Sequence, residues 1–579
     1  RFNWVTGVQT CALPISLGLQ KVIFTGKISK YSHMKKLIIL GCLLFSQFSF
    51  AQEYSAREIE RPKLVVGIVV DQMRQEYFYR FHDRYVEGGL KRLMHDGFMM
   101  QNGHYNYIPT YTGPGHASVY TGTTPATHGI IGNNWYIRAM DDDIYCAEDS
   151  TVSAVGGSES KGKISPRNLL TTTITDELRF ATGKRSKVVG VAIKDRGAAL
   201  PAGHLGDAYW FDGGTGNFMT SDYYYEELPA WVKSFNERKL AAKYLDQTWE
   251  TLFPIETYIQ GASDDNEFES PFKGKARPTF PYDLKKLQKD NGGLGMISST
   301  PYGNTFTVDM AMAAIQGEEL GQRGETDFLA VSFSTPDYIG HRFGPQAIEV
   351  EDNYLRLDRD LAKFFDYLDK EIGKGQYLVF LTADHGVADV VNYMKSERVT
   401  AGSLDTKALT TGLDNFIKEK YGEGDWVSNF SNQQIFLNRE LIAEKGLSLA
   451  KVQTEIADYL LTFDGIKETY TGETMRNQEF TKGLKHLLQM GYNHKSSGDV
   501  MVVMEPAWLA NAGKGTTHGT GFTYDTNVPI VFYGWGVKPG SSSRYATITD
   551  IAPTLSMMLK TRLPNGATGQ PILEIVDAK

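Results

Sequence analysis

Apolar runs of strand length alternate along the chain with segments whose hydrophobic residues repeat at helical spacing. The short runs are apolar throughout, which is typical of strands buried on both faces of a sheet. Segment 349–372 places Leu355, Leu361 and Leu368 close to one helical stripe. We therefore predict an α/β fold, with a largely parallel sheet between two helical layers. The expected core strands are 64–70, 187–193, 327–334, 377–382, 499–503 and 528–533, and further helices are expected at 166–182 and 550–560.

Two long stretches interrupt this alternation. Residues 197–325 are rich in aromatic residues, glycine and proline, and residues 395–497 contain a helix-like segment at 447–462 among short strand candidates. Loops of this length inside a compact domain usually carry function or their own structure. We expect both stretches to be insertions that cover or shape a substrate site. Packing of a small subdomain would explain the aromatic residues of the first stretch equally well.

The first 51 residues have the pattern of a leader. Residues 34–51 contain two lysines, an apolar run at Leu37–Phe45 and a small-x-small end at Ala51, which is typical of a secretory signal peptide. The apolar run is too short to cross a membrane, and a lipoprotein signal ending at Cys42 is the less favoured alternative. Because a signal peptide acts at an N-terminus, we expect residues 1–33 to be a non-native leader. The rest, 52–579, is expected to be one large monomeric domain, periplasmic or secreted, without a membrane anchor.

Charge and cysteine content narrow the class of protein. Residues 52–579 carry all 68 acidic residues and 54 of the 60 basic ones, a net charge of −14. This balance argues against general binding to nucleic acids or anionic membranes. Cys146 is the one cysteine after residue 51, so an intrachain disulfide framework is excluded. We expect stability to come from packing and from bound metal.

Three aspartates lie at or just beyond the ends of predicted strands, and histidines follow two of them closely. In open α/β sheets, ligands bind beyond the carboxyl ends of the strands. Carboxylates and imidazoles together are ligands that suit zinc. The pattern therefore predicts a two-ion site and metal-assisted hydrolysis. The candidate ligands are Asp71, Asp337, His341, Asp384, His385 and, from the stretch GKGTTHGTG, His518.

Thr112 is the candidate nucleophile. It precedes Gly-Pro-Gly and a helix-compatible stretch, and proline is favoured in the first turn of a helix. A helix N-terminus favours an anion, and coordination to a divalent cation can ionise a hydroxyl. The simpler alternative is a threonine that only caps the N-terminus of the helix. The acidic residues and histidines at the strand ends favour the nucleophile.

Taken in order, these motifs resemble the alkaline phosphatase superfamily, and in particular its nucleotide pyrophosphatase/phosphodiesterases and phosphate-irrepressible bacterial alkaline phosphatases. The resemblance rests on Asp71, the Thr112 segment, Asp337-x-x-x-His341, Asp384-His385-Gly386 and Thr517-His518-Gly519. It implies the superfamily's three-layer α/β/α fold and two zinc ions, with manganese as the less favoured metal. It also implies that Asp337, His341 and His518 hold one ion, and that Asp71, Asp384, His385 and Thr112 hold the other.

A monoester carries one more negative charge than a diester, so cations near the nucleophile bear on the substrate class. Lys194 and Arg196 lie just past a predicted strand, and two residues apart in an extended segment they would project to the same side. Arginine can bind two phosphoryl oxygens at once, and lysine adds a point charge. The resemblance gives both residues, with Asn133, contacts to the phosphoryl group; the neighbouring Asn134 is an alternative to Asn133. A solvent-exposed pair at the rim is the competing interpretation.

These expectations combine into zinc-dependent hydrolysis of phosphate monoesters through a phospho-threonine. A phosphodiesterase or nucleotide pyrophosphatase with the same metal centre is the main alternative. A non-catalytic zinc or phosphate-binding protein is a further one, and an arylsulfatase is disfavoured because its Cys/Ser-x-Pro-x-Arg motif is missing. We expect His116, His128 and His204 to be structural and Lys514 to be a surface lysine.

Overall fold

The structure is a computed structural model that describes residues 60–576. Residues Arg61–Lys579 form one compact unit, and the elements below belong to it. The predictions for residues 1–33 and 34–51 fall outside the described residues and stay predictions. From residue 60 to residue 576, no helix combines the length and apolar character needed to cross a membrane.

A ten-stranded sheet forms the centre of the fold, and its middle is parallel. Strand β1 lies between β11 and β12 and is parallel to both, and β6 and β7 continue the parallel set beyond β11. Strand β19 pairs antiparallel with β12 and with β2. The order is β20 (Gly540–Thr547), β2 (Phe98–His104), β19 (Ile530–Gly534), β12 (Tyr377–Thr382), β1 (Leu64–Val70), β11 (Asp327–Phe333), β6 (Val188–Ala192), β7 (Asp207–Asp212), β8 (Asn217–Ser221) and β5 (Ala154–Val155).

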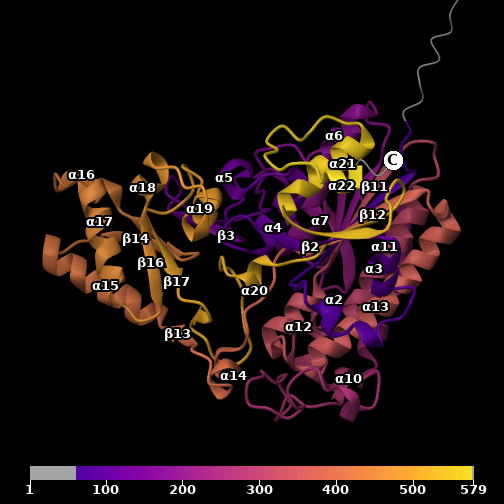
Figure 1. Ribbon diagram of the computed structural model, residues 1–579, viewed down its shortest axis with the longest axis horizontal. Helices are drawn as coiled ribbons and strands as arrows, with labels where there is room; N and C mark the ends of the chain where they lie inside the picture. The colour runs from indigo at the N-terminus through magenta and orange to yellow at the C-terminus, as the bar shows by residue number, and fades with distance from the viewer. Residues whose placement is uncertain (1–59, 577–579) are drawn as a thin grey trace, which may run out of the picture. The chain divides into compact units, whose positions relative to one another are not determined.

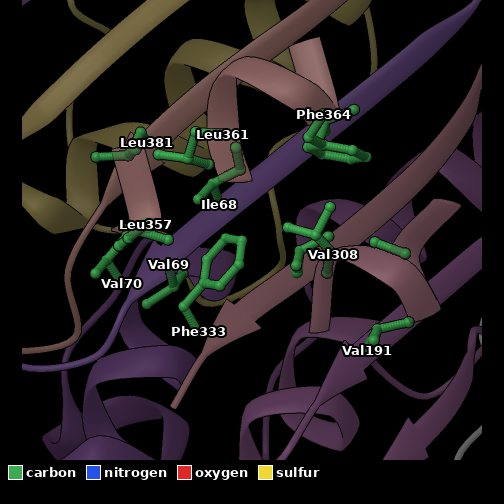
Figure 2. Close-up of a cluster of buried hydrophobic side chains, with 14 of the residues drawn as sticks. Ile68, Val69, Val70, Val191, Val308, Phe333, Leu357, Leu361, Phe364 and Leu381 are labelled. Carbon is green, nitrogen blue, oxygen red and sulfur yellow. The ribbon is translucent and has the colours of Figure 1, made fainter. Parts of the chain in front are cut away.

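Helices cover both faces of this sheet. On one face, Leu357 and Leu361 of α13 (Ile348–Leu368) lie beside Ile68 of β1, as Figure 2 shows. On the other face, α4 (Thr112–Thr121) packs Tyr120 edge-on against aromatic rings of β11 and β12. Side chains alternate between the two faces of a strand. Gly67 fits under α4 because a Cβ there would lie 2.5 Å from the Tyr120 hydroxyl. The predicted three-layer α/β/α fold is confirmed.

The expected helices differ from the observed ones mainly at their ends. Helix α13 matches the predicted 349–372 segment and continues as a short π-helical turn at Asp369–Gly373. The segment 166–182 is helical only as α6 (Ile174–Ala181), because Thr173 and Asp176 form a capping box that begins the helix there. Helix α21 (Ile551–Leu559) agrees with the predicted 550–560.

A second, smaller sheet lies outside the central one. It consists of β14 (Val427–Ser431), β15 (Gln434–Leu437), β17 (Val500–Met504) and β16 (Ile466–Thr471), in that order, and Figure 1 shows it in orange with α15 (Thr406–Tyr421) and α17 (Leu449–Leu460). The assignment of 499–503 to the central sheet was therefore wrong. Its apolar run did indicate a buried strand, but burial alone does not identify the sheet that a strand joins.

The stretch 197–325 begins inside the main architecture. Its first part completes α7 (Asp195–Ala202) and supplies β7 and β8 of the central sheet, so the predicted boundary at 197 was wrong. The aromatic run of β7 is buried, because it lies between β6 and β8. The chain then forms α8 (Ala230–Glu237), α9 (Leu240–Leu245) and α10 (Leu284–Leu287) before α11 (Tyr302–Glu318) returns to the sheet. It remains a prediction that residues 395–497 and the rest of 197–325 shape a substrate site.

Candidate metal centre and nucleophile

The candidate ligands meet at the carboxyl edge of adjacent parallel strands. Asp71 follows β1 directly, and Asp384 and His385 follow β12. Asp337 and His341 lie on α12 (Thr335–Phe343), which begins just after β11. Their spacing of four residues places them on one face of that helix. His518 comes from the loop between β18 (Trp508–Ala510) and α20 (Thr523–Thr526).

One set of ligand atoms surrounds Asp337. Its Oδ1 lies 3.0 Å from Nε2 of His341 and 3.6 Å from Nε2 of His518. These three side chains offer ligand atoms that lie close enough together to hold one metal ion. They are the three residues that the family resemblance assigned to one ion.

A second set surrounds His385. Its Nε2 lies 3.5 Å from Oδ1 of Asp71 and 3.6 Å from Oδ2 of Asp384. The hydroxyl of Thr112 is 3.4 Å from the same nitrogen. All four side chains are buried. Asp71, Asp337 and His385 also form a candidate ion group of their own, so Asp337 lies within reach of both sets.

Hydrogen bonding fixes the tautomer of each histidine. A carbonyl oxygen only accepts, so an Nδ1 bonded to one must carry the proton, and in the neutral imidazole Nε2 is then left as an acceptor. Carboxylate oxygens are acceptors too, and facing acceptors repel unless a cation lies between them. This arrangement is common among metal-binding histidines. Nδ1–H donates to a backbone carbonyl oxygen in each of the three candidate ligand histidines. His341 donates to Thr516 O at 2.8 Å, His385 donates to Gly386 O at 2.9 Å, and His518 donates to Thr110 O at 2.7 Å.

Two carboxylate oxygens of the second set lack protein partners. Oδ1 of Asp71 and Oδ2 of Asp384 are buried and accept no hydrogen bond from the described residues. Leaving a buried charged acceptor unpaired is costly. Both are among the oxygens that face His385 Nε2. The donor chemistry of both sets therefore fits divalent metal ions with oxygen and imidazole ligands.

The site's electrostatics favour added positive charge. Burial raises the pKa of Asp71 well above its usual range, and the neighbouring Asp337 and Asp384 carboxylates raise it further. Burial lowers the pKa of His385 to about 3, and it lowers the pKa of His518 well below its usual value. The two imidazoles are therefore neutral near pH 7, which is the protonation state that binds a metal.

Thr112 is the first residue of α4, not its N-cap. The N-cap is Tyr111, and it makes no side-chain capping hydrogen bond. The simple capping alternative for Thr112 therefore does not describe its position. Close packing holds this helix end at the metal ligands, because a Cβ at Gly115 would lie 2.3 Å from the Asp384 carbonyl oxygen.

Asn133 is hydrogen-bonded to the N-terminus of α4. Its Oδ1 accepts a hydrogen bond of 2.7 Å from the backbone N–H of Gly113. Its side-chain nitrogen has no partner among the described residues. Asn134, the alternative, begins β3 (Asn134–Ile137) and is exposed. Asn133 is therefore the residue that lies beside Thr112.

Lys194 and Arg196 lie at the start of a helix, so the expected extended segment was wrong. Strand β6 ends at Ala192, Lys194 is the N-cap of α7, and Arg196 lies in its first turn. An apolar run of strand length indicates where a strand lies, but it does not determine the backbone conformation of the residues that follow. The two side chains consequently have different partners.

The ammonium group of Lys194 links the two ligand sets. It lies 2.6 Å from Oδ2 of Asp71 and 2.6 Å from Oδ2 of Asp337. Burial opposes its charge, but these two carboxylates raise its pKa above the ordinary lysine value. The guanidinium of Arg196 instead donates to the Tyr145 hydroxyl at 3.1 Å. Tyr145 in turn donates to the Asp195 carboxylate.

Gln72 was missed by the sequence analysis, because a glutamine after a strand carries no recognisable signal. Its side-chain nitrogen donates to Oδ1 of Asp337 at 2.7 Å, and its backbone N–H donates to Oδ1 of Asp384 at 3.1 Å. Its φ of +67° is rare for a side-chain-bearing residue. Gly340 makes room for it, because a Cβ there would lie 1.8 Å from Gln72 Oε1. Gln72 thus orients carboxylates of both sets.

We expect Gln72→Ala to lower metal affinity by about tenfold to 100-fold, since outer hydrogen-bond partners of metal ligands have effects of that size. The change removes the bond to Asp337 and keeps the backbone bond to Asp384. Metal affinity can be measured by competition with a chromogenic chelator. Gln75→Ala is the matched control, because Gln75 is equally buried and its side chain contacts Tyr79 and Met99 instead. Equal affinities in the two variants would contradict this assignment.

The three histidines that the sequence analysis expected to be structural have protein partners. His116 donates from Nδ1 to Thr112 O at 2.9 Å, and its Nε2 is paired with the Ser332 hydroxyl. His128 pairs with Ser118 and accepts from its own loop, and His204 contacts Asp176 and a backbone carbonyl. Burial lowers the pKa of His116 to about 4 and that of His128 to about 3. Lys514 is exposed.

Comparison with known proteins agrees with this geometry. The family described as type I phosphodiesterase / nucleotide pyrophosphatase matches residues 65–528. A Myroides odoratus protein named calcium-transporting ATPase is 46% identical over 94% of this chain and 100% of its own length. The alkaline phosphatase PhoV of Synechococcus elongatus is 45% identical over 94% of this chain and 100% of its own.

A solved structure extends the similarity to three dimensions. The crystal structure of the wild-type alkaline phosphatase PafA has a TM-score of 0.87 and 44% identity, covering 90% of this chain and 99% of that one. PafA of Elizabethkingia meningoseptica is likewise 44% identical over 93% of this chain and 98% of its own length. The chain therefore belongs to the type I phosphodiesterase / nucleotide pyrophosphatase family.

Proposed function

We propose that this chain is an alkaline phosphatase that hydrolyses phosphate monoesters in two displacement steps, with Thr112 as the nucleophile. The observation that carries the proposal is the position of the Thr112 hydroxyl. It is buried at a helix N-terminus, 3.4 Å from His385 Nε2, the nitrogen that the unpartnered oxygens of Asp71 and Asp384 also face. Relatives named alkaline phosphatase, at 44–45% identity over nearly the full chain, support the same activity.

Two zinc ions would complete this site, one held by Asp337, His341 and His518 and the other by Asp71, Asp384, His385 and Thr112. When bound, they would act as Lewis acids that lower the pKa of a coordinated hydroxyl and stabilise charge on the reacting oxygens. Manganese is the less favoured metal, because mixed imidazole and carboxylate ligands suit zinc better.

The protein groups around Thr112 account for the remaining chemistry. The Thr112 oxygen attacks phosphorus and displaces the alcohol, and water then releases phosphate from the phospho-threonine. The N-terminus of α4 favours negative charge at this position. The free side-chain nitrogen of Asn133 can donate to a phosphoryl oxygen, since its Oδ1 is already held by Gly113 N. Burial of the centre excludes bulk water and strengthens these interactions.

Lys194 and Arg196 supply the preference for a dianionic monoester. Lys194 contacts both ligand sets, and Arg196 lies in the first turn of α7 with its Nε buried and without a partner among the described residues. A solved variant of PafA carries substitutions at a threonine, an asparagine, a lysine and an arginine. In PafA the threonine and asparagine are 21 positions apart and the lysine and arginine are two apart. Thr112 and Asn133, and Lys194 and Arg196, have the same spacings in this chain.

We expect the wild-type protein to hydrolyse p-nitrophenyl phosphate with a higher kcat/KM than the methyl p-nitrophenyl diester. Arg196→Ala should lower kcat/KM for the monoester about 100-fold, because removing one preorganised donor to the transferred group has an effect of that order. The diester lacks the extra charge and should lose less than about tenfold. Turnover of the diester by Arg196→Ala would also show that the fold and the metal centre of this variant are intact.

A nucleotide pyrophosphatase or phosphodiesterase is the second candidate, favoured by the family match over residues 65–528. The same assay separates the two functions. A wild-type preference for the diester, or equal losses on both substrates in Arg196→Ala, would support the diesterase and contradict the phosphomonoesterase.

A further inference from the structure

A cavity of about 580 Å³ opens beside Lys194 and Arg196. Its wall toward the metal centre includes these two residues and Tyr338, which directly follows Asp337 in the sequence. The volume is in the range that accommodates a small organic ligand. Lys194 lines the cavity and also contacts Asp71 and Asp337, so we expect a group bonded to the reacting phosphate to reach this cavity.

Two lysines with no partner among the described residues also line the cavity. Lys161 and Lys163 are both exposed, and neither side chain makes a hydrogen bond or ion pair with the described residues. Two carboxylates also line the cavity, and both accept hydrogen bonds. Glu148 accepts from the backbone N–H of Tyr145 at 3.2 Å, and Asp195 accepts from the Tyr145 hydroxyl and from the backbone of Arg196. The charged lining residues are Lys161, Lys163, Lys194 and Arg196 against Glu148 and Asp195, so the charge balance of the lining is positive.

The backbone that carries the two lysines is held in place. The buried Trp210 donates from its indole N–H to the carbonyl oxygen of Lys161 at 2.9 Å. The carbonyl oxygen of Lys163 accepts from the backbone N–H of Asp149 at 2.9 Å. Gly162 between them lies against β5, where a Cβ would come within 2.2 Å of Ala154. The two ammonium groups thus extend from a fixed segment.

We infer that this cavity is a subsite for a second anionic group of the substrate, with Lys161 and Lys163 as its ligands. The substrate class is then a phosphate monoester whose alcohol part carries another phosphate or carboxylate. Trp210, Phe211 and Ile164 provide an apolar wall for the carbon skeleton between the two anions. This inference rests on the proposed phosphomonoesterase activity and adds the chemistry of the leaving group.

The test compares alkyl monophosphates with α,ω-alkanediol bisphosphates of three to six carbons, measured by release of inorganic phosphate. The wild type should show a higher kcat/KM for the bisphosphate, with a maximum at one chain length. Lys161→Ala/Lys163→Ala should lower kcat/KM for that bisphosphate about fivefold or more, because exposed charge pairs contribute up to ~1 kcal/mol each. Turnover of the monophosphate should change less than about twofold. Added salt should weaken the preference.

Lys445→Ala/Lys482→Ala is the matched control, since both lysines are exposed and form no ion pair among the described residues, and neither lines the cavity. A bisphosphate-to-monophosphate ratio that is the same in the wild type and in Lys161→Ala/Lys163→Ala at every chain length would overturn the subsite. Absence of monophosphate turnover in the wild type would instead contradict the proposed function.

A binding measurement keeps the two failures separate. Alkane-α,ω-bisphosphonates are not hydrolysed, so isothermal titration reports their affinity even for an inactive enzyme. The wild type should bind the bisphosphonate of optimal length about fivefold or more tightly than Lys161→Ala/Lys163→Ala does. Equal affinities would refute the subsite whatever the catalytic result.

Discussion

Thr112→Ala should abolish phosphomonoester turnover while the protein keeps its fold and its metal content. The hydroxyl is the group that bonds to phosphorus, and removing the nucleophile of a covalent mechanism leaves no substitute at the same position. We expect kcat/KM for p-nitrophenyl phosphate to fall by about 10⁴-fold or more. The other candidate ligands of the same ion, Asp71, Asp384 and His385, remain, so metal measured by plasma mass spectrometry should be unchanged.

Two further variants make this result specific. Thr112→Ser keeps a hydroxyl and should retain substantial activity. Thr121→Ala removes a threonine of the same helix, one that is also buried and bonds only to Ala117 O, and it should leave kcat/KM within about twofold. Acid quenching of the wild type during turnover should trap phosphate on Thr112, detected by mass spectrometry. Wild-type activity in Thr112→Ala would refute the nucleophile assignment.

The second large effect is expected at Asp337, where the two ligand sets meet. Its Oδ1 faces His341 and His518 and accepts from Gln72, and its Oδ2 accepts from Lys194. Asp337→Asn removes the negative charge from all of these contacts. We expect the loss of about one metal ion per chain and a fall in kcat/KM of about 10³-fold, because a catalytic metal supplies several kcal/mol and each ~1.4 kcal/mol is tenfold.

Asp327→Asn provides the matched control. Asp327 is fully buried at the opposite end of β11, where it accepts from backbone N–H groups and from Arg323. This change should lower the thermal unfolding temperature and leave metal content unchanged. Chelation is the parallel test on the unmodified protein, in which EDTA removes activity and zinc restores it. Full activity with metal bound in Asp337→Asn, or activity that persists after chelation, would contradict the metal assignment.

The sequence predicted the centre of the fold well because buried parallel strands are apolar throughout. The runs before Asp71, Asp337 and Asp384 are β1, β11 and β12, which lie side by side in the sheet. The run at 499–503 shows the limit of this argument. It is a buried strand, but it pairs with β15 and β16 in the smaller sheet, because pairing partners depend on chain segments that are distant in sequence.

The backbone conformation after each strand was harder to predict from the sequence. Lys194 and Arg196 were expected on an extended segment, whereas α7 begins between them and gives them different partners. Gln72 was not identified from the sequence, because its contact with the metal-site carboxylates depends on a positive φ and on space left by Gly340, more than 260 residues away. Neither feature leaves a pattern of hydrophobic and polar positions.

The sequence by itself determined the fold class and the set of candidate ligands, because strand periodicity and ligand chemistry are both local properties of residue types. Only the tertiary structure decided how those residues meet. It put Asp337 within reach of both ligand sets, placed a proton on Nδ1 of each ligand histidine through backbone carbonyls, and brought two lysines that are unpaired among the described residues into the same cavity lining as Arg196. These features depend on atoms brought together by packing from segments far apart in the chain, and distances between such atoms are not encoded in any local spacing.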